Sequence, residues 1–116
     1  MNTDAATGLA TVNPAMIKPA MIKNIAAYHF VTVMDPDALA ARLRARAESG
    51  GLCGTILVAP EGINLFLAGG TAAIDDFVGV LRSDARFAEI VLKASVSTDV
   101  PFSRLKVKVK PEIISF

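Results

Sequence analysis

The chain is poor in the residues that most often carry chemistry, with one cysteine, one histidine and no tryptophan among 116 residues. Cys53 cannot form an internal disulfide, which fits a reducing compartment, and its place in a strand-like stretch suits a small buried apolar residue. His29 also lies in a strand-like stretch, so a triad of nucleophile, base and orienting group is not expected. No spacing of Cys, His, Asp and Glu resembles a metal site. We therefore expect no catalytic residue, metal or cofactor in this chain.

Long apolar runs and a secretory signal are also missing, which argues against a membrane-spanning or exported chain and for the cytoplasm. Hydrophobic residues make up 53% of the sequence, enough for one folded domain at this length. Residues 1–23 show neither helical nor strand periodicity, and we expect a poorly ordered leader there. The folded domain is then expected over residues 24–116.

Positive charge is concentrated near the C-terminus, although the whole chain carries a net charge of only +1. Residues 104–116 have four basic residues and one acidic residue, a net of +3, and the rest has eight basic and ten acidic residues, a net of −2. The four basic residues alternate with apolar ones, so a strand here has one cationic face. This basic row consists of Arg104, Lys106, Lys108 and Lys110. It predicts phosphate contacts with a nucleic acid, or alternatively an edge strand charged to resist aggregation.

Hydrophobic periodicity predicts a strand, a helix, two strands, a second helix and a further strand, with an extra strand at the C-terminal end. The expected strands cover residues 25–33, 52–59, 63–68, 90–96 and 104–116, and the expected helices cover residues 36–48 and 74–81. This order predicts an α+β fold, the ferredoxin-like (acylphosphatase-like) split βαβ arrangement. Two helices then cover one face of an antiparallel sheet, and the other face stays open for a partner.

Two connections have recognisable turn chemistry. Pro60 and Glu61 suit the centre of a type I turn, and Gly62 suits a left-handed conformation that closes the hairpin. Asp35 is expected to cap the first helix, with Pro36 at its first position. An acylphosphatase would need a glycine-rich loop with a phosphate-binding arginine after its first strand. Here that connection, residues 33–40, carries the carboxylates of Asp35 and Asp37, which argue against this activity.

Aromatic residues gather on two of the expected strands. Tyr28 and Phe30 share one side of the first strand, and Phe66 can share that side of the third. This is similar to RNA-binding sheets that stack bases on aromatic rings, but the basic and glycine positions of that motif are absent from residues 63–68. Core packing is therefore the expected role of these three rings.

Three segments together resemble a known bacterial family. "GTILVAPEGIN" with "LAGG", "LRSDARFAEIVLKASVS" and "PFSRLKVKVKPEI" are similar to the N-terminal domain of the rhodanese-domain tRNA uridine hydroxylases. The resemblance implies that the full-length protein oxidises the wobble uridine of certain tRNAs to 5-hydroxyuridine with molecular oxygen. It places the essential cysteine in a rhodanese domain expected after residue 116 and absent from this chain, and Cys53 does not stand in for it.

The resemblance implies an accessory, non-catalytic role for this domain. The basic row would hold tRNA phosphates, while the hairpin residues Glu61, Gly62 and Asn64 would lie near the substrate. The alternative is a scaffold that packs on the rhodanese domain or on a second copy of itself.

Overall fold

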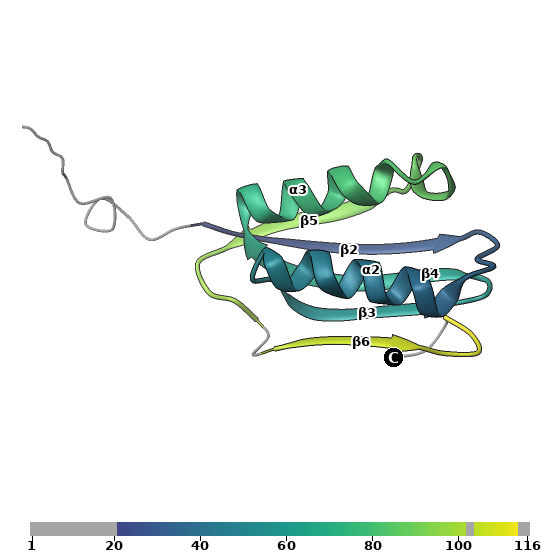
Figure 1. Cartoon of the computed structure of the whole chain (residues 1–116). Helices are drawn as coiled ribbons and strands as arrows, with labels where there is room; N and C mark the ends of the chain where they lie inside the picture. The colour runs from purple at the N-terminus through teal and green to yellow at the C-terminus, as the bar shows by residue number, and fades with distance from the viewer. Residues whose placement is uncertain (1–20, 102–103, 114–116) are drawn as a thin grey trace, which may run out of the picture.

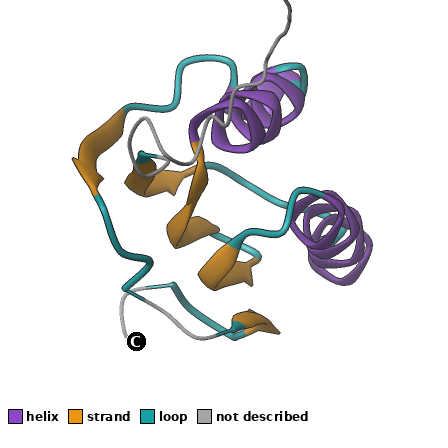
Figure 2. Cartoon of the chain, turned by 90° about the vertical axis from the view of Figure 1, so that its left-hand side faces the viewer, coloured by secondary structure: helices purple, strands orange, loops and turns teal. Residues whose placement is uncertain are grey.

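The computed structural model describes residues 21–101 and 104–113, which form one five-stranded sheet with two helices on one face (Figure 1, Figure 2). The strand order across the sheet is β5-β2-β4-β3-β6. The strands are β2 (Ile22–Phe30), β3 (Cys53–Ala59), β4 (Gly62–Gly70), β5 (Leu92–Ser97) and β6 (Leu105–Val109). The helices are α2 (Pro36–Ser49) and α3 (Thr71–Arg82), with a short 3-10 helix, η2 (Ala85–Phe87), after α3.

The strand pairing confirms the predicted ferredoxin-like arrangement. β2 pairs antiparallel with β4 and β5, and β3 pairs antiparallel with β4. The extra strand β6 lies beside β3 and runs parallel to it, so the five-stranded sheet is mixed rather than wholly antiparallel. The connection from β5 to β6 reaches from one edge of the sheet to the other, which places the C-terminal strand at the edge farthest from β5.

Helix α2 begins at the expected residue and ends one residue later than expected, whereas α3 begins at Thr71, three residues before the expected start at residue 74. α2 starts at Pro36, ends before Gly50, and is followed by Gly51 with φ +67°, a conformation that favours glycine. Asp35 occupies the N-cap position, but its side chain forms no capping hydrogen bond because it pairs with Arg86 instead. No helix within the described residues is long and apolar enough to span a bilayer.

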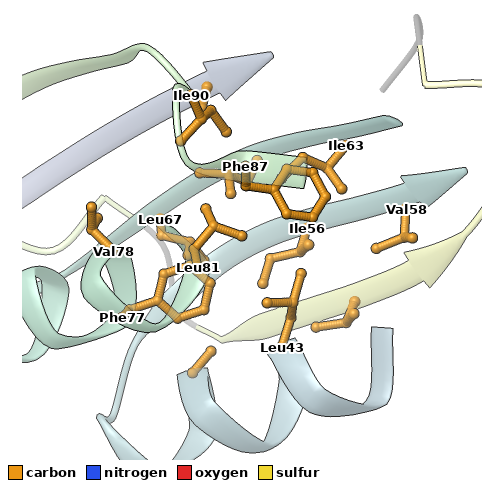
Figure 3. Close-up of a cluster of buried hydrophobic side chains, with 14 of the residues drawn as sticks. Leu43, Ile56, Val58, Ile63, Leu67, Phe77, Val78, Leu81, Phe87 and Ile90 are labelled. Carbon is orange, nitrogen blue, oxygen red and sulfur yellow. The ribbon is translucent and has the colours of Figure 1, made fainter. Parts of the chain in front are cut away.

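The core lies between the helices and one face of the sheet (Figure 3). Each fully buried Leu, Ile or Phe side chain stabilises the fold by about 1.5–3 kcal/mol. The helices contribute Leu39, Leu43, Ile74, Phe77, Val78 and Leu81, the strands contribute Ile25, Ile56, Val58, Ile63, Leu65 and Leu67, and Phe87 and Ile90 close one end. Since side chains alternate along a strand, the intervening residues point to the face that has no helix.

The first strand begins at Ile22, earlier than expected and inside the predicted leader. The ammonium group of Lys23 lies 2.8 Å from a carboxylate oxygen of Asp75 on α3, and the Asn24 amide donates to the Ser97 hydroxyl at 3.1 Å. These long-range partners extend the strand into a stretch without local periodicity. Residues 1–20 of the predicted leader lie outside the described residues.

Candidate nucleic-acid interface

Three aromatic rings lie on the helix-free face of the sheet. Tyr28, Phe30 and Phe66 are 45%, 62% and 43% exposed, and the Tyr28 and Phe30 ring centroids are 5.2 Å apart. The expectation that these rings belong to the core is wrong. Their strand neighbours, such as Ala27 and Leu65, take the helix side, which leaves the rings on the other side of the sheet.

The basic row follows the edge strand β6. Val107 is buried in the core, so Lys106 and Lys108 on either side of it point to the helix-free face. All four members of the row are exposed. Within the described residues none of the four side chains forms an ion pair or a hydrogen bond. No carboxylate of the described residues therefore neutralises this edge.

A fifth cation, missed by the sequence analysis, lies at the opposite edge of the same face. Lys93 on β5 is exposed and follows Leu92, which packs against the core, so the lysine points away from the helices. A single lysine among apolar residues gave no signal in the sequence. Its position follows only from the pairing of β5 with β2.

The strand registers place these residues in one line across the sheet. Lys93 pairs with Ala26, which pairs with Phe66; Phe66 pairs with Thr55, which pairs with Lys106. We call this line the cross-strand row. It has a cation at each end and an aromatic ring at its centre, which is a pattern suited to a polyanion with flat bases.

The predicted hairpin residues hold the C-terminal arm, residues 110–113. Glu61 accepts a hydrogen bond from the Ile113 backbone N–H at 3.0 Å, and the Asn64 amide donates to the Ile113 carbonyl at 3.1 Å. Asn64 and Ile113 are both buried, and the segment after β6 turns to the side of the sheet opposite the helices (Figure 2). Polar groups of Glu61 and Asn64 that were expected to lie near a substrate are thus bonded within the domain.

Gly62 brings two backbones unusually close together. Its φ is +146°, positive as expected for a glycine, but in the extended region rather than the left-handed helical region near about +57°. The turn residues before it are held by the chain after β2, since the Val31 and Val33 amides donate to the carbonyls of Glu61 and Pro60. Main-chain hydrogen bonds therefore hold the hairpin end to the chain after β2.

A charged cluster lies at the connection between β2 and α2, where Asp35 meets Asp84 and Arg86 from the segment after α3. The Arg86 guanidinium lies 2.6 Å from an Asp35 oxygen and 2.7 Å from an Asp84 oxygen. The hydrogen bonds from Arg86 lower the pKa of both carboxyls and raise the pKa of the guanidinium. Because two carboxylates already surround Arg86, this connection is poorly suited to hold a phosphate, as the sequence indicates.

We expect this cluster to make stability depend on acid pH. Both carboxyls have a folded-state pKa below the unfolded value of about 3.9, so their contribution is present above that pH and is lost as pH falls through the folded pKa. The urea midpoint should fall more between pH of about 6 and pH of about 2.5 in the native chain than in Arg86→Gln. Arg46→Gln changes an exposed arginine on α2 that forms no ion pair with Asp35 or Asp84, and it should keep the native pH dependence. If the urea midpoint falls equally with acid in Arg86→Gln and in the native chain, the cluster is not the source of the pH dependence.

The two remaining side chains with reactive groups are His29 and Cys53. The His29 Nε2 atom lies 3.0 Å from the Arg86 carbonyl, and its ring meets the Phe87 ring edge-on. Cys53 is half-buried at the start of β3. Residues 21–101 and 104–113 contain no group of three His, Cys, Asp or Glu placed to hold a metal.

A family model that has the observed fold covers most of the described residues. Residues 22–113 match the family model described as "UPF0176 acylphosphatase like domain". Proteins named tRNA uridine(34) hydroxylase are similar: one from Xanthomonas euvesicatoria is 58% identical over 96 residues, which is 83% of this chain and 39% of that protein. One from Bordetella avium is 57% identical over 93 residues, which is 80% of this chain and 38% of that protein.

Solved structures of low sequence identity share the fold. The BLUF protein BlrB in its dark state matches with a TM-score of 0.58 and 18% identity, covering 78% of this chain and 74% of that one. A bacterial light-regulated adenylyl cyclase matches with a TM-score of 0.61 and 15% identity, covering 77% and 28%. At these identities the likeness concerns the arrangement of helices and strands alone.

Proposed function

This chain belongs to the family of UPF0176 acylphosphatase-like domains, and from that premise we propose that it docks tRNA for a wobble-uridine 5-hydroxylase. Its relatives carry the name tRNA uridine(34) hydroxylase, and the chain spans 37–39% of the length of those it matches. The hydroxylase activity of a whole protein is thus part of the proposal. Residues 24–116 act as an accessory, non-catalytic domain in the cytoplasm, and the oxidation takes place in a rhodanese domain.

The observation that carries the proposal is a row of cations along the edge strand β6 that lack ion-pair partners within residues 21–101 and 104–113; two of them, Lys106 and Lys108, point to the helix-free face. Arg104, Lys106, Lys108 and Lys110 have no ion-pair partner among the described residues. Lysine and arginine side chains in such a row bind successive phosphates with little dependence on base sequence. Exposed aromatic rings on the same face add surfaces on which unpaired bases can stack.

The hairpin residues are proposed to lie near the bound RNA because the hairpin is next to the end of the basic row. The Lys110 amide donates to the Val58 carbonyl at 2.8 Å, so the basic row ends beside the strand that leads into the hairpin. Glu61 and Asn64 hold the C-terminal arm there, and Gly62 allows the close strand contact. Their contribution is to shape the surface next to the phosphates.

The test is the salt dependence of tRNA binding by the 116-residue chain. Four phosphate contacts predict a log–log slope of about −3, and Lys108→Ala should reduce its magnitude by about 0.7–0.9. Lys106→Ala together with Lys108→Ala should reduce it by about 1.5. Arg46→Ala is the matched control, because it removes one exposed positive charge from α2 on the helix side of the sheet. Fluorescence anisotropy of labelled tRNA at several salt concentrations gives all four slopes.

The alternative function is a scaffold that packs on the rhodanese domain or on a second copy of the chain. Its support is the exposure of Tyr28 and Phe30, since neighbouring aromatic side chains on one face also suit a protein interface. Mixing the chain separately with tRNA and with a rhodanese domain distinguishes the two. Binding to the protein, with tRNA binding absent or insensitive to salt, would replace the docking proposal with the scaffold.

A further inference from the structure

A groove lies on the helix-free face, beside the central aromatic ring of the cross-strand row. It has a volume of about 360 Å³ and is lined mainly by Ala26, Tyr28, Asn64, Phe66, Val91 and Lys93. A smaller hollow of about 140 Å³ continues from it along β2 and β5, sharing three of these residues. Pockets for small ligands typically start at about 300 Å³, so the groove suits one nucleotide rather than a duplex.

The walls of the groove are set by the strand register. Tyr28 pairs with Asn64 and Phe66 pairs with Ala26, so the two rings are diagonal neighbours on adjacent strands. Diagonal neighbours on one sheet face lie about 7–8 Å apart, a distance that long aromatic side chains can share with a flat ligand. The Ala26 methyl group is small, and it keeps the floor between the rings low.

The charge beside the groove indicates an anionic ligand. Lys93 pairs with Ala26 across β5 and β2, on the side away from Phe66, and forms no ion pair with a described residue. Lys106 ends the same cross-strand row at the far edge. An apolar peptide would leave these two cations without partners, whereas a nucleotide chain supplies both flat bases and phosphates.

We propose that this groove is a base-stacking subsite, in which an unpaired RNA base lies against Tyr28 and Phe66 while Lys93 contacts a neighbouring phosphate. The subsite rests on the proposed function and extends it, because it makes the domain selective for unpaired over paired RNA. Bases in a duplex already stack on one another and cannot enter a groove of this size.

Two RNAs test the proposal with the 116-residue chain: a stem-loop carrying a fluorescent adenine analogue in its loop, and a blunt duplex of the same stem. Tyr28→Leu should weaken stem-loop binding about 5- to 100-fold and reduce the fluorescence change on binding. The salt slope should stay the same, because no charge is removed. Tyr28→Phe keeps the ring and should behave as the native chain, and Phe66→Leu should repeat the Tyr28→Leu result if that variant fails to fold.

The outcomes separate this proposal from RNA docking by the basic row. If both leucine variants bind the stem-loop with native affinity and native fluorescence while Lys108→Ala still lowers the salt slope, docking stands and the subsite is refuted. Equal weakening of the duplex and the stem-loop by Tyr28→Leu would also refute it. If neither RNA binds the native chain, both proposals fail. A loss confined to the stem-loop would establish the subsite.

Discussion

Gly62→Ala should destabilise the domain by about 3–5 kcal/mol, a large part of the stability of a domain of this size. A Cβ atom at this position would lie 2.0 Å from the His29 carbonyl oxygen and 3.0 Å from the Phe30 Cα. These are backbone atoms of β2, so relief requires the β2–β4 pairing to open. The φ of +146° adds strain of its own for a residue with a side chain. Urea unfolding followed by circular dichroism measures the loss.

Gly54 and Gly70 provide the comparison for this result. Gly54→Ala should be equally damaging, because its Cβ would lie 2.0 Å from the Phe66 carbonyl oxygen at a φ of +127°. Gly70→Ala, at the other end of β4, meets no atom within 4 Å and should change the unfolding free energy by less than about 0.5 kcal/mol. A Gly62→Ala chain as stable as Gly70→Ala would show that the two strands lie farther apart than described.

Ile113→Ala should cost about 2–4 kcal/mol, the largest effect expected here after the two glycine substitutions. The Ile113 side chain is fully buried, and its backbone is tied to Glu61 and Asn64. Leu57, the cross-strand partner of Asn64, is only 2% exposed although it points away from the helices, which fits coverage by the C-terminal arm. Losing the isoleucine side chain should loosen the arm and raise the exposure of this patch.

The measurement for this variant combines urea unfolding with limited proteolysis near the C-terminus. Val96→Ala, at a 59% exposed position on β5, removes a comparable side chain and should change the unfolding free energy by less than about 0.5 kcal/mol. If Ile113→Ala unfolds at the native urea concentration and resists the protease equally, the arm does not stabilise the domain.

The elements and their order could be predicted because each is a local pattern. Helix faces such as Ile74, Phe77, Val78 and Leu81 follow a period of 3.6 residues, and the strand alternation shows which residues share a side. The exposure of Tyr28 could not be predicted in the same way. The alternation of side chains shows that each strand has two faces, but which face the helices cover depends on the topology of the whole sheet.

The contacts between the hairpin and the C-terminal arm could not be predicted from the sequence for a related reason. Glu61 and Ile113 are 52 positions apart in the chain, so their hydrogen bond leaves no local pattern. Lys93 likewise joins the candidate surface only through the pairing of β5 with β2. The sequence predicts the charge of the basic row, while the partners of each side chain come from the fold.

The cross-strand row also sets the distance that a bound nucleic acid must span to touch both edges of the sheet. Four strand intervals of about 4.8 Å separate β5 from β6, so Lys93 and Lys106 stand about 19 Å apart along the row. Phosphates of a helically stacked strand advance about 3.4 Å per nucleotide, so a strand that keeps this rise would need about six nucleotides to bridge both lysines, running across the strands of the sheet. A strand whose bases are splayed onto the rings is more extended and bridges them with fewer nucleotides.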